Sequence, residues 1–267
     1  MHINHFPLYT ELFLWLGKYS TIAIIILIGA VVGFLSGLLG KGGSAITTPA
    51  LQIFAGINPF AALASPLPAT LPTTLSASFA YRDKNLINKR VVLISILIGI
   101  PATLAGSYYS DWFGGKALMI LTALFVLGLG ISFFIFNNDG QTRSSAGTPN
   151  WKISLVAISV GFLSGLLANS GGVLFGPLFI RFLKLPTKEA LASSLLVAAG
   201  LAIPGTIAHW YLGHIDWQVV LFLSLSSIPF SYLGARVALQ MQNVQLEKVF
   251  GIVLIGLGAF DLWYNLF

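Results

Sequence analysis

Charged side chains and cysteine are what this sequence has least of. Of its 267 residues only 8% are charged and 56% are hydrophobic, and the mean hydropathy is +0.88. Soluble domains carry about 25% charged residues. So few charges could not cover a soluble fold of this size, whereas a surface that faces lipid needs none. The composition therefore predicts an all-α polytopic membrane protein, and the absence of cysteine excludes disulfides and thiolate metal sites.

The usual signals of an enzyme are also missing. The histidines stand at positions 2, 5, 209 and 214, without the HExxH spacing of a metal pair. The sequence has no nucleophile elbow, no P-loop and no pair of carboxylates within an apolar run, which excludes ATP-driven pumping by this chain alone. We expect no catalytic role, no cofactor and no metal. The net charge of +6 lies in short loops between apolar runs, so nucleic acid is not an expected partner.

Polar breaks divide the apolar sequence into two sets of about five helical segments. The first set lies at 20–39, 44–55, 60–81, 91–110 and 116–136, and the second at 153–168, 173–183, 187–210, 217–238 and 246–266. A straight span needs about 20 residues, so the second segment of each set is too short to cross a bilayer alone. The predicted organisation is an interfacial lead-in (1–19), a first transmembrane repeat (20–136), a cytoplasmic linker (137–152) and a second repeat (153–267).

The two sets are copies of one unit. GFLSGLL occurs at Gly33–Leu39 and again at Gly161–Leu167, and ALAS occurs at Ala62–Ser65 and Ala190–Ser193, both at an offset of 128 positions. Three further pairs share this offset: Pro49 with Pro177, Pro101 with Pro229, and Gly106 with Gly234. We expect the last two glycines to face lipid and to pack helices either within one chain or between two copies in a homodimer.

Loop charges predict that the copies are inverted. The loop Arg82–Arg90 has four basic residues, and its counterpart Trp210–Gln218 has no Lys or Arg. The loop Arg181–Lys188 has three basic residues, and its counterpart Ile53–Phe60 has no charge. Because basic loops stay in the cytoplasm, equivalent loops should lie on opposite sides of the membrane, with five crossings per repeat and both termini outside. The alternative is a random scatter of a few charges.

A glycine-rich polar break in each repeat is the first candidate site. The breaks lie in GLLGKGGSAITTP (Gly37–Pro49) and GLLANSGGVLFGP (Gly165–Pro177), each before a short apolar segment that contains a proline. Backbone N–H groups and the partial positive charge of a helix N-terminus can hold an anion. The polar residues within the breaks are Lys41, Ser44, Asn169 and Ser170. The alternative is that the glycines only allow tight helix packing.

The repeated Ser65 and Ser193 mark a second cluster. Pro66, Pro68 and Pro72 follow Ser65 and must break or kink that helix, because proline lacks the N–H that a helix needs. Thr73 lies in the same stretch. The freed carbonyls and the hydroxyls could bind a ligand, or the hydroxyls could bond only to their own helix.

These motifs resemble the TauE/SafE family of sulfite and organosulfur anion permeases, also called the TSUP family, over nearly the whole chain. The resemblance rests on GKGGS at Gly40–Ser44, on NSGGV at Asn169–Val173 and on the ALAS segments. The family commonly has Thr-Ser-Leu where the first repeat has Ser65-Pro66-Leu67. The substrate site that this resemblance implies contains Gly42, Gly43, Ser44, Ser65, Asn169, Gly171, Gly172 and Ser193. The polar break and the serine cluster add Ser170 and Ser194, with Lys41 and Thr73 as secondary candidates.

The resemblance implies a permease that moves a small sulfur-containing anion across the cytoplasmic membrane. We expect alternating access around a midplane site, with a proton or sodium as coupling ion and the lipid bilayer as surroundings. The alternatives are an anion channel of the same architecture, a transporter of a non-sulfur organic anion, and a membrane-embedded enzyme, for which the sequence offers no catalytic cluster.

Overall fold

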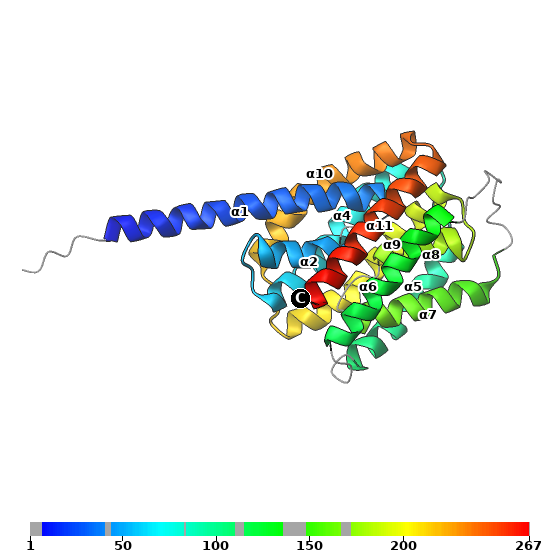
Figure 1. Cartoon of the computed structure of the whole chain (residues 1–267), viewed down its shortest axis with the longest axis horizontal. Helices are drawn as coiled ribbons and strands as arrows, with labels where there is room; N and C mark the ends of the chain where they lie inside the picture. Colours follow the sequence, from blue (N-terminus) through cyan, green and yellow to red (C-terminus); the bar gives the residue numbers. More distant parts are fainter. Residues whose placement is uncertain are drawn as a thin grey trace, which may run out of the picture.

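The structure, a computed structural model, describes residues 7–40, 44–82, 84–109, 115–135, 148–166 and 172–266. These residues form α-helices joined by short loops and contain no strand, as the composition predicts (Figure 1). The helices are α1 (Pro7–Leu38), α2 (Ser44–Ile53), α3 (Pro59–Ala64), α4 (Pro66–Arg82), α5 (Lys89–Tyr109), α6 (Gly115–Ile135), α7 (Asn150–Leu166), α8 (Gly172–Arg181), α9 (Thr187–Tyr211), α10 (Trp217–Gln240) and α11 (Asn243–Leu266).

Two predicted boundaries differ from the structure. Helix α1 is continuous from Pro7, so described residues of the 1–19 lead-in extend the first span as one helix, which projects from the rest of the molecule (Figure 1). Helix α7 begins at Asn150 and therefore includes the last residues of the 137–152 linker. The interfacial position of 1–19 and the cytoplasmic position of the linker stay predictions.

The proline-rich segment is broken where its first proline stands. The predicted 60–81 segment consists of α3 and α4, which meet at Ser65. Pro66 has no N–H with which to continue the helical hydrogen bonds. The equivalent segment of the second half has Ser194 at this position, and α9 runs through it unbroken. The prolines of the first copy, which the second copy lacks here, therefore account for a broken helix in one half and a continuous helix in the other.

The first helix of each half packs against a helix of the other half. Helix α1 packs along α10, and α7 packs along α5. The glycines of the repeated motif make both contacts: a Cβ atom at Gly37 would collide with the carbonyl oxygen of Ser231, and one at Gly165 would collide with that of Thr103. Gly165 stands 128 positions after Gly37, and Ser231 stands 128 positions after Thr103. The two helix pairs are therefore equivalent by internal pseudosymmetry.

The same helix pairs correct our expectation for Gly106 and Gly234. Both glycines are buried, and they lie against the carbonyl oxygens of Phe162 and Phe34 in the neighbouring helix of the same chain. They do not face lipid. Backbone carbonyls leave no room for a side chain at either position.

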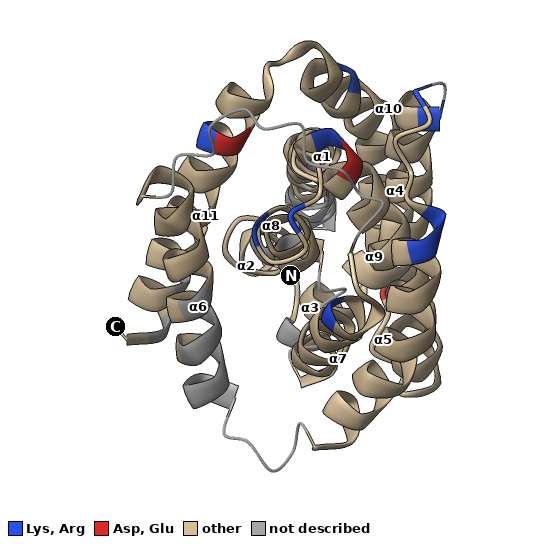
Figure 2. Ribbon diagram, turned by 90° about the vertical axis from the view of Figure 1, so that its right-hand side faces the viewer, with Lys and Arg blue, Asp and Glu red and all other residues tan. Residues whose placement is uncertain are grey.

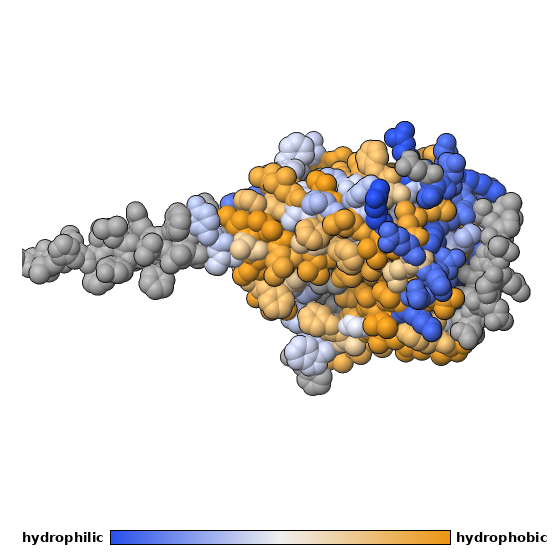
Figure 3. All heavy atoms as spheres, turned by 90° about the horizontal axis from the view of Figure 1, so that it is seen from above, coloured by the Kyte–Doolittle hydropathy of each residue, from blue (hydrophilic) through white to orange (hydrophobic). Residues whose placement is uncertain are grey.

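The basic loops of the two halves meet at one end of the molecule, which we call the basic end. The backbone N–H of Asn88, in the α4–α5 loop, donates to Ser193 on α9. Lys188, at the start of α9, donates to the carbonyl of Leu239 near the end of α10, 2.7 Å away. Hydrophilic side chains gather at this end in the space-filling view (Figure 3).

Exposed aromatic residues gather at the opposite end, which we call the aromatic end. There the ring of His214, in the α9–α10 loop, stacks on Phe60 of α3 with ring centroids 4.9 Å apart. The exposed aromatic residues of the adjoining helix ends are Tyr108, Tyr109, Trp210, Tyr211 and Trp217. Tyr and Trp favour the interface between lipid and water. Helix α5 begins at the basic end and its equivalent α10 ends there, so they run in opposite directions; inversion across a bilayer stays a prediction.

The outer surface is apolar between the two ends. Among the described residues, four helices are long and apolar enough to cross a membrane: Tyr19–Leu38, Lys89–Tyr109, Thr187–Tyr211 and Trp217–Gln240. Large apolar side chains on them are exposed, such as Leu27 at 65%, Leu97 at 63% and Leu225 at 60%. Hydrocarbon stabilises such a surface, whereas water does not.

Candidate functional site

Two short helices point their N-termini toward each other in the middle of the protein. Helix α2 is followed by the α2–α3 loop, which lies at the aromatic end because the next helix, α3, contains Phe60. Helix α8 ends at Arg181, at the start of the basic loop. The two helices contact each other, and in the view along the bundle they lie near its centre (Figure 2). Each therefore starts in the interior and runs outward to a different end.

These N-termini follow directly on the two glycine-rich breaks. Ser44 is the first residue of α2, and Gly172 is the first residue of α8. The other predicted break residues, Lys41, Gly42, Gly43, Asn169, Ser170 and Gly171, lie outside the described residues. The first N–H groups of a helix have no partner within it, and its N-terminus carries about half a positive charge. Two such ends facing one interior region make it attractive to an anion.

Ser194 connects the second half to the first break. Its hydroxyl lies 3.0 Å from the carbonyl oxygen of Gly40 and 2.9 Å from that of Leu191. Gly40 has a φ of +62°, which favours glycine, and a Cβ there would also collide with Ser194 and Leu191. The backbone immediately before the first break is thus held against α9 by a predicted site residue.

Ser65 and Ser193 lie at opposite ends of the bundle. Both are fully buried. Ser193 accepts a hydrogen bond from the backbone N–H of Asn88 at the basic end, and Ser65 accepts one from that of Asp216 at the aromatic end, each across 3.0 Å. The structure does not bring these serines together. Each fixes the residue before a helix of the other half, and their binding of substrate stays a prediction.

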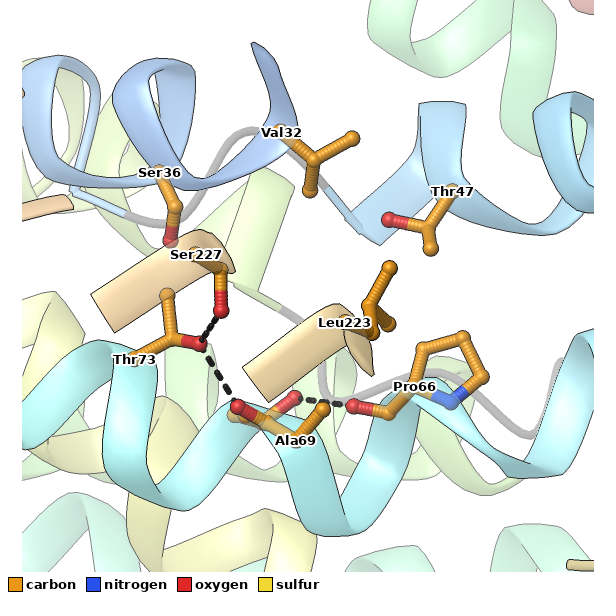
Figure 4. A pocket seen from close by; sticks show the side chains of 9 residues that line it. Val32, Ser36, Thr47, Pro66, Ala69, Thr73, Leu223 and Ser227 are labelled. Atoms are coloured by element: carbon orange, nitrogen blue, oxygen red, sulfur yellow. Dashed lines mark hydrogen bonds between the residues drawn. The ribbon is translucent and has the colours of Figure 1, made fainter. Parts of the chain in front are cut away.

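A cavity of about 30 Å³ lies between α1, α2, α4 and α10 (Figure 4). The hydroxyl groups in its lining belong to Ser36, Thr47, Thr70, Thr73 and Ser227. Sequence reasoning selected Thr73 but missed Ser36, Thr47 and Ser227. Ser36 is the one polar residue of the repeated GFLSGLL motif, and this signal could have identified it.

The equivalent place in the other half is filled by apolar side chains. At the repeat offset, Leu201 replaces Thr73 and Phe175 replaces Thr47. Both are buried, and Leu201 packs against Gly99, which replaces Ser227. The hydroxyl-lined cavity therefore belongs to one side of an otherwise repeated fold.

A comparison with known protein families shows which family this chain belongs to. The family described as "Sulfite exporter TauE/SafE" matches residues 25–260, which include both repeats. The chain belongs to the TauE/SafE family. The match confirms the resemblance read from the duplicated glycine breaks, and it makes the chain a membrane transporter.

Proteins similar to this chain carry general names. The chain is 26% identical to the probable membrane transporter protein YunE of Bacillus subtilis, over 91% of this chain and 98% of that protein. It is 27% identical to a probable membrane transporter protein of Xylella fastidiosa, over 88% of this chain and 92% of that protein. A similarly named protein of Methanocaldococcus jannaschii is 23% identical, over 90% of this chain and 94% of that protein.

Proposed function

We propose that this chain is a multi-pass transporter of the cytoplasmic membrane that moves a small sulfur-containing anion such as sulfite or a sulfonate. One observation carries the proposal: α2 and α8 start in the interior, each directly after a glycine-rich break, and run outward in opposite directions. Family membership supports sulfite and related anions as the substrate class.

The proposed anion site uses backbone groups rather than a fixed counter-charge. Gly42, Gly43, Gly171 and Gly172 allow the anion to approach the backbone N–H groups closely, because no Cβ shields them. Ser44, Asn169, Ser170 and Ser194 add polar side chains around it, and Lys41 attracts the anion from nearby. Helix dipoles hold an anion more weakly than a buried arginine would, which permits its release on the far side.

Transport proceeds by alternating access around this site. Because α1 packs on α10 and α7 on α5, each half contains one helix held by the other, and the two crossed pairs can move as units. Rocking of these units opens the interior first toward the basic end and then toward the aromatic end. Transporters built from internal repeats commonly place their site between such units, near the middle of the membrane.

Ligand-dependent thermal unfolding in detergent tests the site. Sulfite, thiosulfate and taurine are compared with chloride for the parent chain, for Gly42→Leu with Gly171→Leu, and for Gly256→Leu as control. Gly256 is exposed on α11 with no atom near a Cβ placed there. We expect sulfur anions alone to raise Tm in the parent and in the control, with the effect lost in the double variant. Equal stabilisation of all three proteins, or none by any sulfur anion, would refute the site.

A further inference from the structure

The hydroxyl-lined cavity has features that the anion site does not explain. Its lining contains five hydroxyl groups and no charged side chain. Ser36 is 2% exposed, and its Oγ has no hydrogen-bond partner within the described part of the chain. Burying a hydroxyl without a partner costs about 1–3 kcal/mol. A buried hydroxyl without a partner in the wall of a cavity points to a small polar ligand there.

The hydroxyl protons decide the charge of that ligand. Thr70 donates its proton to the carbonyl of Pro66, 2.8 Å away, and Thr73 donates to the carbonyl of Ala69, 2.7 Å away. A hydroxyl has one proton and two lone pairs. With its proton donated to Ala69, Thr73 accepts from Ser227 in their 2.5 Å contact. The hydroxyl oxygens of these threonines offer lone pairs, which suit a cation better than an anion.

The volume of the cavity and its uncharged lining indicate which cation would fit. A water molecule needs about 10–15 Å³ of this kind of space, so about 30 Å³ holds a small ion with one water. Divalent cations in proteins are held mostly with the help of carboxylates, and none lines this cavity. We propose that the cavity is a sodium site, formed by the hydroxyl oxygens of Ser36, Thr47, Thr70, Thr73 and Ser227 (Figure 4).

The repeat predicts one such site per chain. In the second half Leu201, Phe175 and Gly99 replace Thr73, Thr47 and Ser227, and apolar side chains fill the equivalent place. Ser164 replaces Ser36, but its hydroxyl donates to the carbonyl of Val160, 2.6 Å away, and it does not line this cavity. The pseudosymmetry is therefore broken at the residues that would bind the ion.

The position of the site gives the ion a role in transport. Ser227 belongs to the second half and the other ligands to the first, so a bound ion bridges the halves. Thr47 lies in the first turn of α2, whose N-terminus faces the proposed anion site. Sodium would fix this helix and so favour anion binding. This coupling depends on the proposed function, whereas sodium binding itself does not.

Thermal unfolding in detergent without any sulfur anion tests the binding. The parent chain is titrated with NaCl against choline chloride at constant ionic strength, and KCl is a second comparison. We expect a saturable rise of Tm with sodium. Ser36→Ala should raise the half-maximal sodium concentration at least tenfold, and Thr73→Val should do the same. Ser164→Ala is the matched control, equally buried at 2% exposure, and should respond as the parent does.

Two outcomes would overturn the sodium site. One is that sodium does not specifically raise Tm in the parent. The other is that Ser36→Ala and the parent have the same half-maximal sodium concentration. Ser36→Ala removes a hydroxyl without a hydrogen-bond partner among the described residues, so it should fold even where Thr73→Val does not. If sodium raises Tm but sulfite, thiosulfate and taurine do not, with or without sodium, the proposed substrate is refuted and the sodium site stands. A rate of anion transport that does not change when a sodium gradient is applied would refute the coupling.

Discussion

The hydroxyl of Ser193 accepts a hydrogen bond from the backbone N–H of Asn88, across 3.0 Å. Asn88 in turn caps α5, because its side chain accepts from the N–H of Val91. At the offset of 128 positions, Ser65 accepts from Asp216, which caps α10 in the same way. Each repeated serine thus fixes the start of a helix in the opposite half.

Ser193→Ala and Ser65→Ala are therefore expected to destabilise the fold. Each variant removes the acceptor of a part-buried backbone N–H, and such a hydrogen bond contributes about 0.5–1.5 kcal/mol. The measurement is Tm in detergent, with Ser164→Ala as control, because among the described residues Ser164 donates to Val160 of its own helix and to no loop of the other half. An unchanged Tm together with weaker anion binding would instead make Ser65 and Ser193 substrate ligands.

The glycines at the contacts of α1 with α10 and of α7 with α5 should tolerate no side chain. Gly37→Ala and Gly165→Ala place a methyl group against the carbonyls of Ser231 and Thr103, which belong to the backbone and cannot rotate away. We expect loss of monodisperse protein in size-exclusion chromatography for both. Gly128→Ala is the control, since a Cβ at that helical glycine meets nothing within 4 Å. Normal yield of Gly37→Ala would show that the α1–α10 packing is wrong.

Single cysteines can report the topology directly, because the natural chain has none. Leu212 is exposed at the aromatic end, and Gln242 is exposed between α10 and α11 at the basic end. In intact cells, a membrane-impermeant thiol reagent should label Leu212→Cys and should label Gln242→Cys only after the cells are opened. The reverse pattern would place the basic end outside the cytoplasm.

The helices and the repeat were predictable because both depend on local sequence. Apolar length and polar breaks locate the helices, and the proline at position 66 marks the break between α3 and α4. The repeat offset identified Ser65 and Ser193 as equivalent. It did not show that each lies beside a loop of the other half, since that depends on how the halves pack.

The parts that sequence reasoning missed depend on contacts between distant segments. The cavity combines Ser36 of α1, Thr47 of α2 and Ser227 of α10, and no local pattern relates these residues. The expected orientation of Gly106 was also wrong, although Ser95, Gly99, Thr103 and Gly106 follow one another at helical spacing on the buried side of α5. Helix–helix packing in lipid uses such small residues, so this spacing was the signal that could have placed Gly106.

Counterflow in proteoliposomes tests the central claim most directly. Vesicles that contain the purified protein and millimolar unlabelled sulfite are diluted into trace [³⁵S]sulfite under anaerobic conditions, with the Gly42→Leu and Gly171→Leu double variant beside the Gly256→Leu control. We predict transient accumulation of label that saturates with internal sulfite, is equal in parent and control, and is absent from the double variant. Accumulation that survives in the double variant, or its absence from the parent with sulfite, thiosulfate and taurine alike, would contradict the account.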